Sequence, residues 1–160
     1  MTNMSVCPGC LGRFADIEGP VHAYLKGSAE CWARFGQALA LQYSDHRYWP
    51  AHQLLTDAYS LQHSLGDDLR ARRSARIHLA ALYAQIHLGQ SEARLVALRK
   101  ALSDPSLADL PTVWPVPSVS IAEIDISEPA RHLHSVERFA RAVLSDWSDH
   151  HSIAAQLCKV

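Results

Sequence analysis

Helix-starting residues recur along the chain from residue 28 onward, and they restrict the fold more than any other feature. Ser28 and Ser91 are good N-terminal caps, Pro50 suits a first helical turn, Asp67 can cap a helix, and residues 127–129 read Ser-Glu-Pro. Apolar side chains follow these residues at the three- and four-residue spacing of amphipathic helices. The predicted helices begin near residues 28, 50, 67, 91 and 128, and end near residues 43, 64, 89, 104 and 156. The sequence therefore predicts an all-α fold, an antiparallel array of about five helices with an irregular N-terminal cap.

Glycine and proline mark two less regular segments. Residues 1–27 contain four glycines and two prolines and show little helical periodicity. Residues 104–119 indicate an extended connector that Trp114 anchors to the body; its prolines are Pro105, Pro111, Pro115 and Pro117. A short helical turn is expected near residues 121–126. We expect one domain over residues 1–160, made of a zinc-knuckle loop region (1–27), a four-helix portion (28–103), the connector (104–119) and a C-terminal helical segment (120–160).

Composition and charge exclude several classes of protein. The 160 residues are 48% hydrophobic and 19% charged, which is typical of a globular chain and not of a disordered one. The formal net charge of −1 provides no field that would attract nucleic acid or anionic lipid. No apolar run approaches the ~18 residues of a membrane span, and the N-terminus lacks the pattern of a secretory signal. We therefore expect a cytoplasmic protein whose partners include neither membrane nor nucleic acid.

The run Cys7-Pro-Gly-Cys10 indicates a metal site. Two thiolates three positions apart can bind one tetrahedral zinc ion from a tight turn, and Gly9 gives that turn a permissive backbone. The alternative, a thioredoxin-type redox pair, requires a helix that opens at the first cysteine. Gly12 and residues 19–20 follow instead, and they oppose a helix there. The spacing therefore favours zinc over redox chemistry.

Two further ligands are needed to complete a structural zinc site. Cys31 is the natural third ligand, because it lies in the first turn of the helix that Ser28 starts, where the helix N-terminus stabilises a thiolate. His22 is nearest in sequence and is our first choice for the fourth ligand. A histidine from the helical body is the alternative. Cys158, near the C-terminus, is expected to be an unpaired thiol.

Several histidines fall on or beside the apolar faces of predicted helices. At ~100° per residue, His63 lies at the edge of the buried arc of its helix, with Asp57 on the opposite edge. His78 and His151 lie on the apolar faces of two other helices. These four residues could form a polar pocket or an alternative ligand set for a metal, and they could equally form a structural hydrogen-bonded network. The basic stretch at residues 70–76 is interpreted as a solvated helix face, with phosphate binding as the weaker alternative.

Separated runs of residues form a specific combination over nearly the whole chain. They are Cys7-Pro-Gly-Cys10, Gly19-Pro-Val-His22-Ala-Tyr24, Ser28-Ala-Glu-Cys31-Trp32, Leu55-Thr-Asp57-Ala-Tyr59-Ser-Leu-Gln62-His63, His52, His78-Leu79 and Trp147-Ser-Asp-His150-His151. With these runs the chain resembles an uncharacterised bacterial domain-of-unknown-function family. The resemblance implies no activity, and it points to Cys7, Cys10, His22, Cys31, Asp57, His63, His78 and His151. Members of that family tend to carry Gly after the second cysteine and Pro-Gly after the histidine, where this chain has Leu11 and Ser64-Leu65.

Two functions follow as expectations. The first is a zinc-stabilised helical module without enzymatic activity, which binds a protein or a small-molecule ligand and in which the metal is structural. The alternative is a metal-dependent hydrolase or lyase that uses the inward-facing histidines with Asp57. The second function requires at least two of His63, His78 and His151 to approach each other in a water-accessible pocket.

Overall fold

The computed structural model describes residues 2–108, 110 and 113–160, so Pro111 of the expected connector lies outside the described residues. An antiparallel hairpin opens the chain, with β1 at Met4–Val6 paired to β2 at Arg13–Ala15. The described part then contains six α-helices: α1 Ala29–Ser44, α2 His52–His63, α3 Leu69–His87, α4 Glu92–Leu102, α5 Pro129–Asp146 and α6 His151–Leu157. Short 3-10 turns occupy His46–Ala51, Ile121–Glu123 and Ser148–His150. The predicted helical fold with an irregular N-terminal cap is confirmed.

Local capping explains most helix starts. Ser28 accepts a hydrogen bond from the Cys31 amide, Ser91 accepts one from Arg94, and Glu128 accepts one from Arg131. Two starts differ from the prediction. Asp68, and not Asp67, caps α3, and Pro50 lies inside a 3-10 turn, so that α2 begins at His52.

The C-terminal segment is two helices where the sequence indicated one. The Trp147 amide donates to the carbonyls of Val143 and Leu144, which tightens the last turn of α5 and ends it. His151 Nε2 then lies 2.8 Å from the Leu144 carbonyl and satisfies it from a side chain. The chain changes direction and α6 packs on α3. This break raises the number of α-helices in the described part from about five to six.

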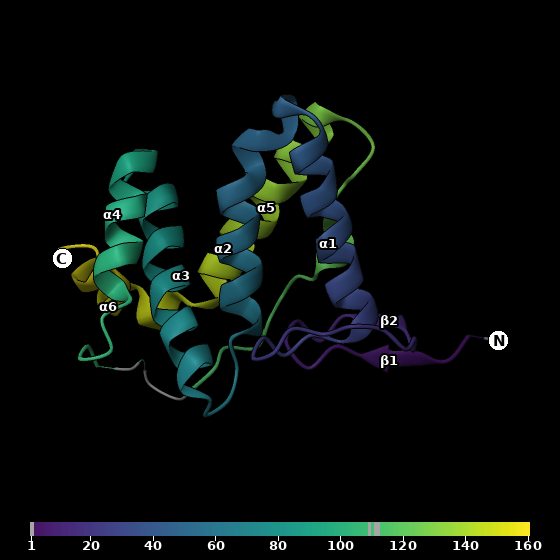
Figure 1. Cartoon of the computed structure of the whole chain (residues 1–160), viewed down its shortest axis with the longest axis horizontal. Coiled ribbons are helices and arrows are strands. Elements are labelled where there is room, and N and C mark those ends of the chain that lie inside the picture. The colour runs from purple at the N-terminus through teal and green to yellow at the C-terminus, as the bar shows by residue number, and fades with distance from the viewer. Residues whose placement is uncertain (1, 109, 111–112) are drawn as a thin grey trace.

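The core is built around α2. Figure 1 shows α2 between α1 and α3, with α5 crossing behind it and the N-terminal hairpin beneath the start of α1. Leu55, Ala58 and Leu61 are completely buried, and so are the polar residues Asp57 and His63 of the same helix. Because α2 is covered on nearly every side, it can present different polar groups to different neighbours.

Arginine and tryptophan side chains attach the segment after α4 to the body. Arg76 is only 1% exposed and donates to the carbonyls of Leu102 and Leu107, so the expectation of a solvated basic face is wrong for this residue. Trp114 packs edge-on against Trp147, with ring centroids 5.4 Å apart. Within the described residues, no helix combines the length and the hydropathy needed to cross a membrane.

Candidate metal centre

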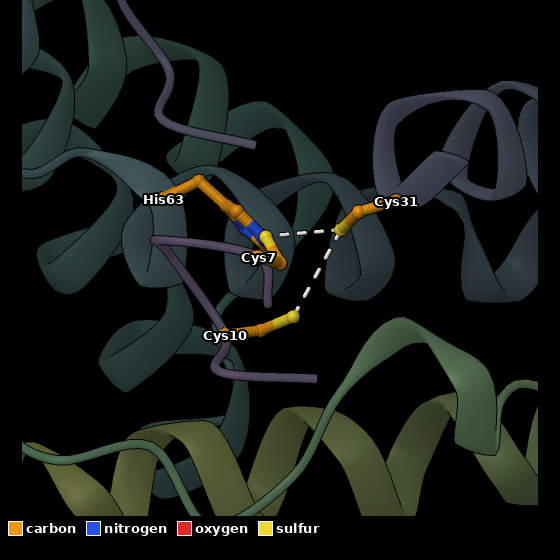
Figure 2. Close-up of side chains that lie close together, drawn as sticks. All are labelled: Cys7, Cys10, Cys31 and His63. Atoms are coloured by element: carbon orange, nitrogen blue, oxygen red, sulfur yellow. Dashed lines mark hydrogen bonds between the residues drawn. The ribbon is translucent and has the colours of Figure 1, made fainter. Parts of the chain in front are cut away.

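Four side chains from three separate segments converge in the interior. Figure 2 shows Cys7 and Cys10 on the N-terminal loop, Cys31 on α1 and His63 on α2, with their sulfur and nitrogen atoms turned toward one another. One donor atom from each residue lies within 4.8 Å of all the others. The exposed fractions are 0% for Cys7, Cys31 and His63, and 3% for Cys10. Among the described residues, this is the group of at least three His, Cys, Asp or Glu side chains that could hold a metal ion.

Three of the distances between donor atoms match those expected around a tetrahedral metal ion. With Zn–S bonds of ~2.3 Å and Zn–N bonds of ~2.0–2.1 Å, two sulfur ligands lie ~3.8 Å apart and a sulfur and a nitrogen lie ~3.5 Å apart. The Sγ atoms of Cys10 and Cys31 are 3.9 Å apart. The Nε2 atom of His63 is 3.6 Å from Cys7 Sγ and 3.4 Å from Cys31 Sγ. The four groups therefore have the chemistry and the spacing that a tetrahedral metal ion requires.

Local structure places each of the three segments. The turn after β1 is closed by hydrogen bonds of 2.9 Å from the Cys7 amide to the Gly12 carbonyl and from the Leu11 amide to the Cys7 carbonyl. Cys31 is in the first turn of α1, where the positive end of the helix dipole favours a thiolate. His63 is the last residue of α2, and its carbonyl accepts a hydrogen bond from the Lys26 amide. That bond holds the loop between Cys10 and Cys31 against α2.

Neighbouring groups orient the histidine and shield one sulfur. The Nδ1–H of His63 donates to the Tyr59 carbonyl over 2.7 Å, which leaves the Nε2 lone pair facing the three sulfurs. The Tyr59 hydroxyl lies 3.4 Å from Cys31 Sγ and can donate to a thiolate there. The rings of Tyr59 and His63 are also stacked, with centroids 3.9 Å apart. These contacts are the kind of support that surrounds ligands in metal proteins.

Hydrogen bonds among the three cysteines shift the pKa values of their thiols. Hydrogen bonds from Cys10 and Cys31 lower the pKa of Cys7 far below its ordinary range. Hydrogen bonds with Cys10 and Cys7, together with burial, raise the pKa of Cys31 far above it. Without a cation, these shifts favour the thiolate form of Cys7 and the thiol form of Cys31. A divalent ion would supply the positive charge that keeps all three sulfurs deprotonated.

Glycine is required where the loop touches α2. A Cβ at Gly9 would lie 2.2 Å from His63 Cδ2 and 2.6 Å from the Lys26 carbonyl oxygen. Real Cβ atoms do not approach so closely, so any larger residue would displace either the turn or the imidazole. The Pro-Gly between the two cysteines therefore serves close packing as well as the turn.

The structure does not bring His22 to the cluster. Its Nδ1 accepts hydrogen bonds from the amides of Tyr24 and Leu25, at 3.2 and 3.1 Å, and its ring packs against Trp32. The lone pair of His22 Nδ1 therefore points to the backbone of the loop that carries His22. His63, from the helical body, occupies the fourth position that sequence proximity had suggested for His22. The sequence signal for His63 was its position at the edge of the buried arc of its helix, which made it one of the body histidines that could supply the alternative ligand.

The remaining polar candidates lie outside the cluster and make other contacts. Asp57 Oδ1 lies 2.7 Å from His78 Nδ1, and Asp57 Oδ2 accepts hydrogen bonds from Gln85 and Arg99. His151 Nε2 is hydrogen-bonded to the Leu144 carbonyl. Cys158 is a buried thiol 3.4 Å from the Ala80 carbonyl and forms no disulfide with any described residue. His63, His78 and His151 thus have three different sets of partners.

Together, the helices and the cluster define a class of protein: a helical domain with a buried Cys3His group that could hold a metal ion. The chain belongs to DUF5946, a family of unknown function, whose model matches residues 5–148. The matched region contains all four residues of the cluster. No curated protein and no solved structure matches the chain. The family description states no activity, so the function is inferred from the site.

Proposed function

We propose that the chain binds one zinc ion through Cys7, Cys10, Cys31 and His63, and that this ion is structural. The proposal is carried by one observation, the four buried donor atoms within 4.8 Å of one another. Three thiolates and one imidazole are ligands that suit zinc, which takes sulfur and nitrogen in tetrahedral geometry. Four protein ligands fill the tetrahedron, so no position is left for a reactive water molecule.

The proposed zinc ion would fasten the N-terminal loop to two helices. Its ligands come from the turn after β1, the start of α1 and the end of α2. The hairpin strands are only three residues long each, and a two-stranded hairpin of that size has little stability of its own. The free energy of metal binding would therefore contribute directly to the free energy of folding.

A non-enzymatic binding module agrees best with the rest of the surface. A groove of about 390 Å³ is lined by Trp49, Leu54 and Leu95 together with amide side chains such as Gln53 and with the Glu92 carboxylate. Apolar walls with a few polar groups are typical of sites that bind a partner or a small ligand. A hydrolase or lyase would need at least two of His63, His78 and His151 in one pocket, and the separate partners of the three count against that alternative.

The metal content of natively purified protein tests the proposal. We expect elemental analysis to find one zinc ion per chain, and a strong chelator to lower the melting temperature and remove hydrogen-exchange protection around residues 7–31. Protein that is folded, metal-free and indifferent to the chelator would contradict the proposal.

Ligand variants test the assignment of the four residues. In cobalt-substituted protein, we expect His63→Ala to alter the visible spectrum of tetrahedral sulfur-bound cobalt and to weaken metal binding by at least tenfold. His22→Ala is the matched control and should keep the spectrum. The reverse pattern would show that His22 is the ligand.

A further inference from the structure

A second pocket, of about 210 Å³, lies between the N-terminal loop and α3. Tyr24 contributes from the loop, and α3 contributes the rest of the lining: Arg70, Arg73, Ser74, Ile77 and His78. None of these six side chains is a carboxylate, whereas two are guanidinium groups. The pocket is therefore suited to an anion.

The Arg70 side chain is held in place without a ligand. The Arg70 guanidinium lies 5.2 Å from the centroid of the Tyr24 ring, and it donates to both carboxylate oxygens of Asp68, at 3.2 and 3.0 Å. Arg73 follows it nearly one helical turn later and is partly buried in the same lining. Two guanidinium groups on one helix face can form several charge-assisted hydrogen bonds to a single oxyanion.

A buried carboxylate orients the histidine of this pocket. Asp57 is fully buried and lies 2.7 Å from His78 Nδ1, while the His78 side chain remains 20% exposed. The ring nitrogen left to the pocket is therefore Nε2. This atom can accept a hydrogen bond from a protonated oxyanion, or donate one when the imidazole is charged.

We propose that this pocket binds the phosphate group of a small phosphomonoester. Phosphate offers oxygens to both guanidinium groups, and with a second pKa near ~6 it can also carry a P–OH that pairs with a neutral imidazole. The volume is below the ~300–1,000 Å³ of pockets that enclose drug-sized ligands, so it suits a phosphate group with a few further atoms. The pocket contains none of the four proposed zinc ligands, but Tyr24 lies on the loop between Cys10 and Cys31 that the zinc ion would fasten, so the zinc content has to be followed in the test.

An NMR titration of the full-length, 15N-labelled protein tests this proposal. Inorganic phosphate and ethyl phosphate are added separately, with sodium chloride at equal ionic strength as the reference. We expect saturable shifts at Tyr24, Arg73 and His78 with both phosphates and not with chloride. Arg73→Gln should weaken binding at least tenfold, because a charge-assisted hydrogen bond is lost. Arg138→Gln, an exposed arginine of α5, is the control and should bind as the unchanged protein does.

Specific outcomes would overturn the proposal. These are shifts that chloride reproduces, equal binding by Arg73→Gln and Arg138→Gln, or a response to inorganic phosphate without one to ethyl phosphate. If Arg73→Gln lowers the melting temperature, Arg70→Gln provides the same comparison from an exposed position. The zinc content of every sample is measured, so that loss of phosphate binding and loss of metal are told apart.

Discussion

Leu11 adopts a backbone conformation that suits glycine. Its φ is 58°, in the left-handed region, which costs an L-residue roughly 1–2 kcal/mol. The residue directly follows Cys10, and its amide closes the turn by donating to the Cys7 carbonyl. The Leu11 side chain is 50% exposed and contributes little to the core. The strain is therefore imposed by the turn that presents the two cysteines.

Replacement of Leu11 by glycine should relieve this strain. The matched comparison is Leu11→Ala, which removes the same side-chain contacts but keeps a Cβ in the left-handed region. We expect Leu11→Gly to unfold in urea with a free energy about 1 kcal/mol higher than that of Leu11→Ala. Equal stabilities would mean that the turn relaxes and that φ at this position is not strained in solution.

Helix α1 connects the candidate metal centre to the rest of the core. Its first turn holds Cys31, and further along Phe35 stacks on Tyr59 with ring centroids 4.0 Å apart. Gly36 lies on the exposed face of this helix, and a Cβ there would meet nothing within 4 Å. A larger residue therefore fits at Gly36, whereas none fits at Gly9.

Gly36→Ala should stabilise the protein. Alanine loses less backbone entropy than glycine in a helix, so we expect the free energy of unfolding to rise by about 0.5–1 kcal/mol with unchanged metal content. The contrasting variant is Gly9→Ala, which should weaken metal binding because its Cβ would displace His63. Urea denaturation and elemental analysis of both variants test these two predictions. A lower free energy of unfolding for Gly36→Ala would contradict the structure, in which nothing packs against this position.

At the scale of the whole molecule, Asp57 joins three helices. It lies on α2, accepts hydrogen bonds from His78 and Gln85 on α3, and pairs with Arg99 on α4. Its side chain is 0% exposed, so its charge is stabilised by these partners and not by water. The carboxylate therefore determines how α3 and α4 are placed on α2.

Removal of this carboxylate should strongly destabilise the fold. We expect Asp57→Ala to lower the free energy of unfolding by about 3–5 kcal/mol, because Arg99 and His78 lose a buried partner. Any chain that remains folded should keep its metal, since Asp57 and His63 lie on different faces of α2. Asp149→Ala, at an exposed position, is the control. A loss below ~1 kcal/mol, the range of exposed ion pairs, would show that water replaces the network.

Short-range signals were sufficient for much of the fold. Ser28, Ser91 and Glu128 cap their helices through bonds that span three residues, so the sequence alone predicts those starts. The spacing of Cys7 and Cys10 and the place of Cys31 in a first helical turn are equally local. The chain itself thus determined the helical class and three of the four residues in the cluster.

The tertiary structure decided what depended on distant segments. His63 lies 56 residues from Cys7 in sequence, and local spacing cannot rank it above His22 or the other histidines. The break after α5 was also missed: the apolar stripe continues past Trp147 in the sequence, but the chain turns there and α6 packs against α3. Likewise, the burial of Arg76 depends on carbonyls that α4 brings to it. Local hydrogen bonds form within a few residues in any compact arrangement, whereas these pairings exist only once the helices are packed together.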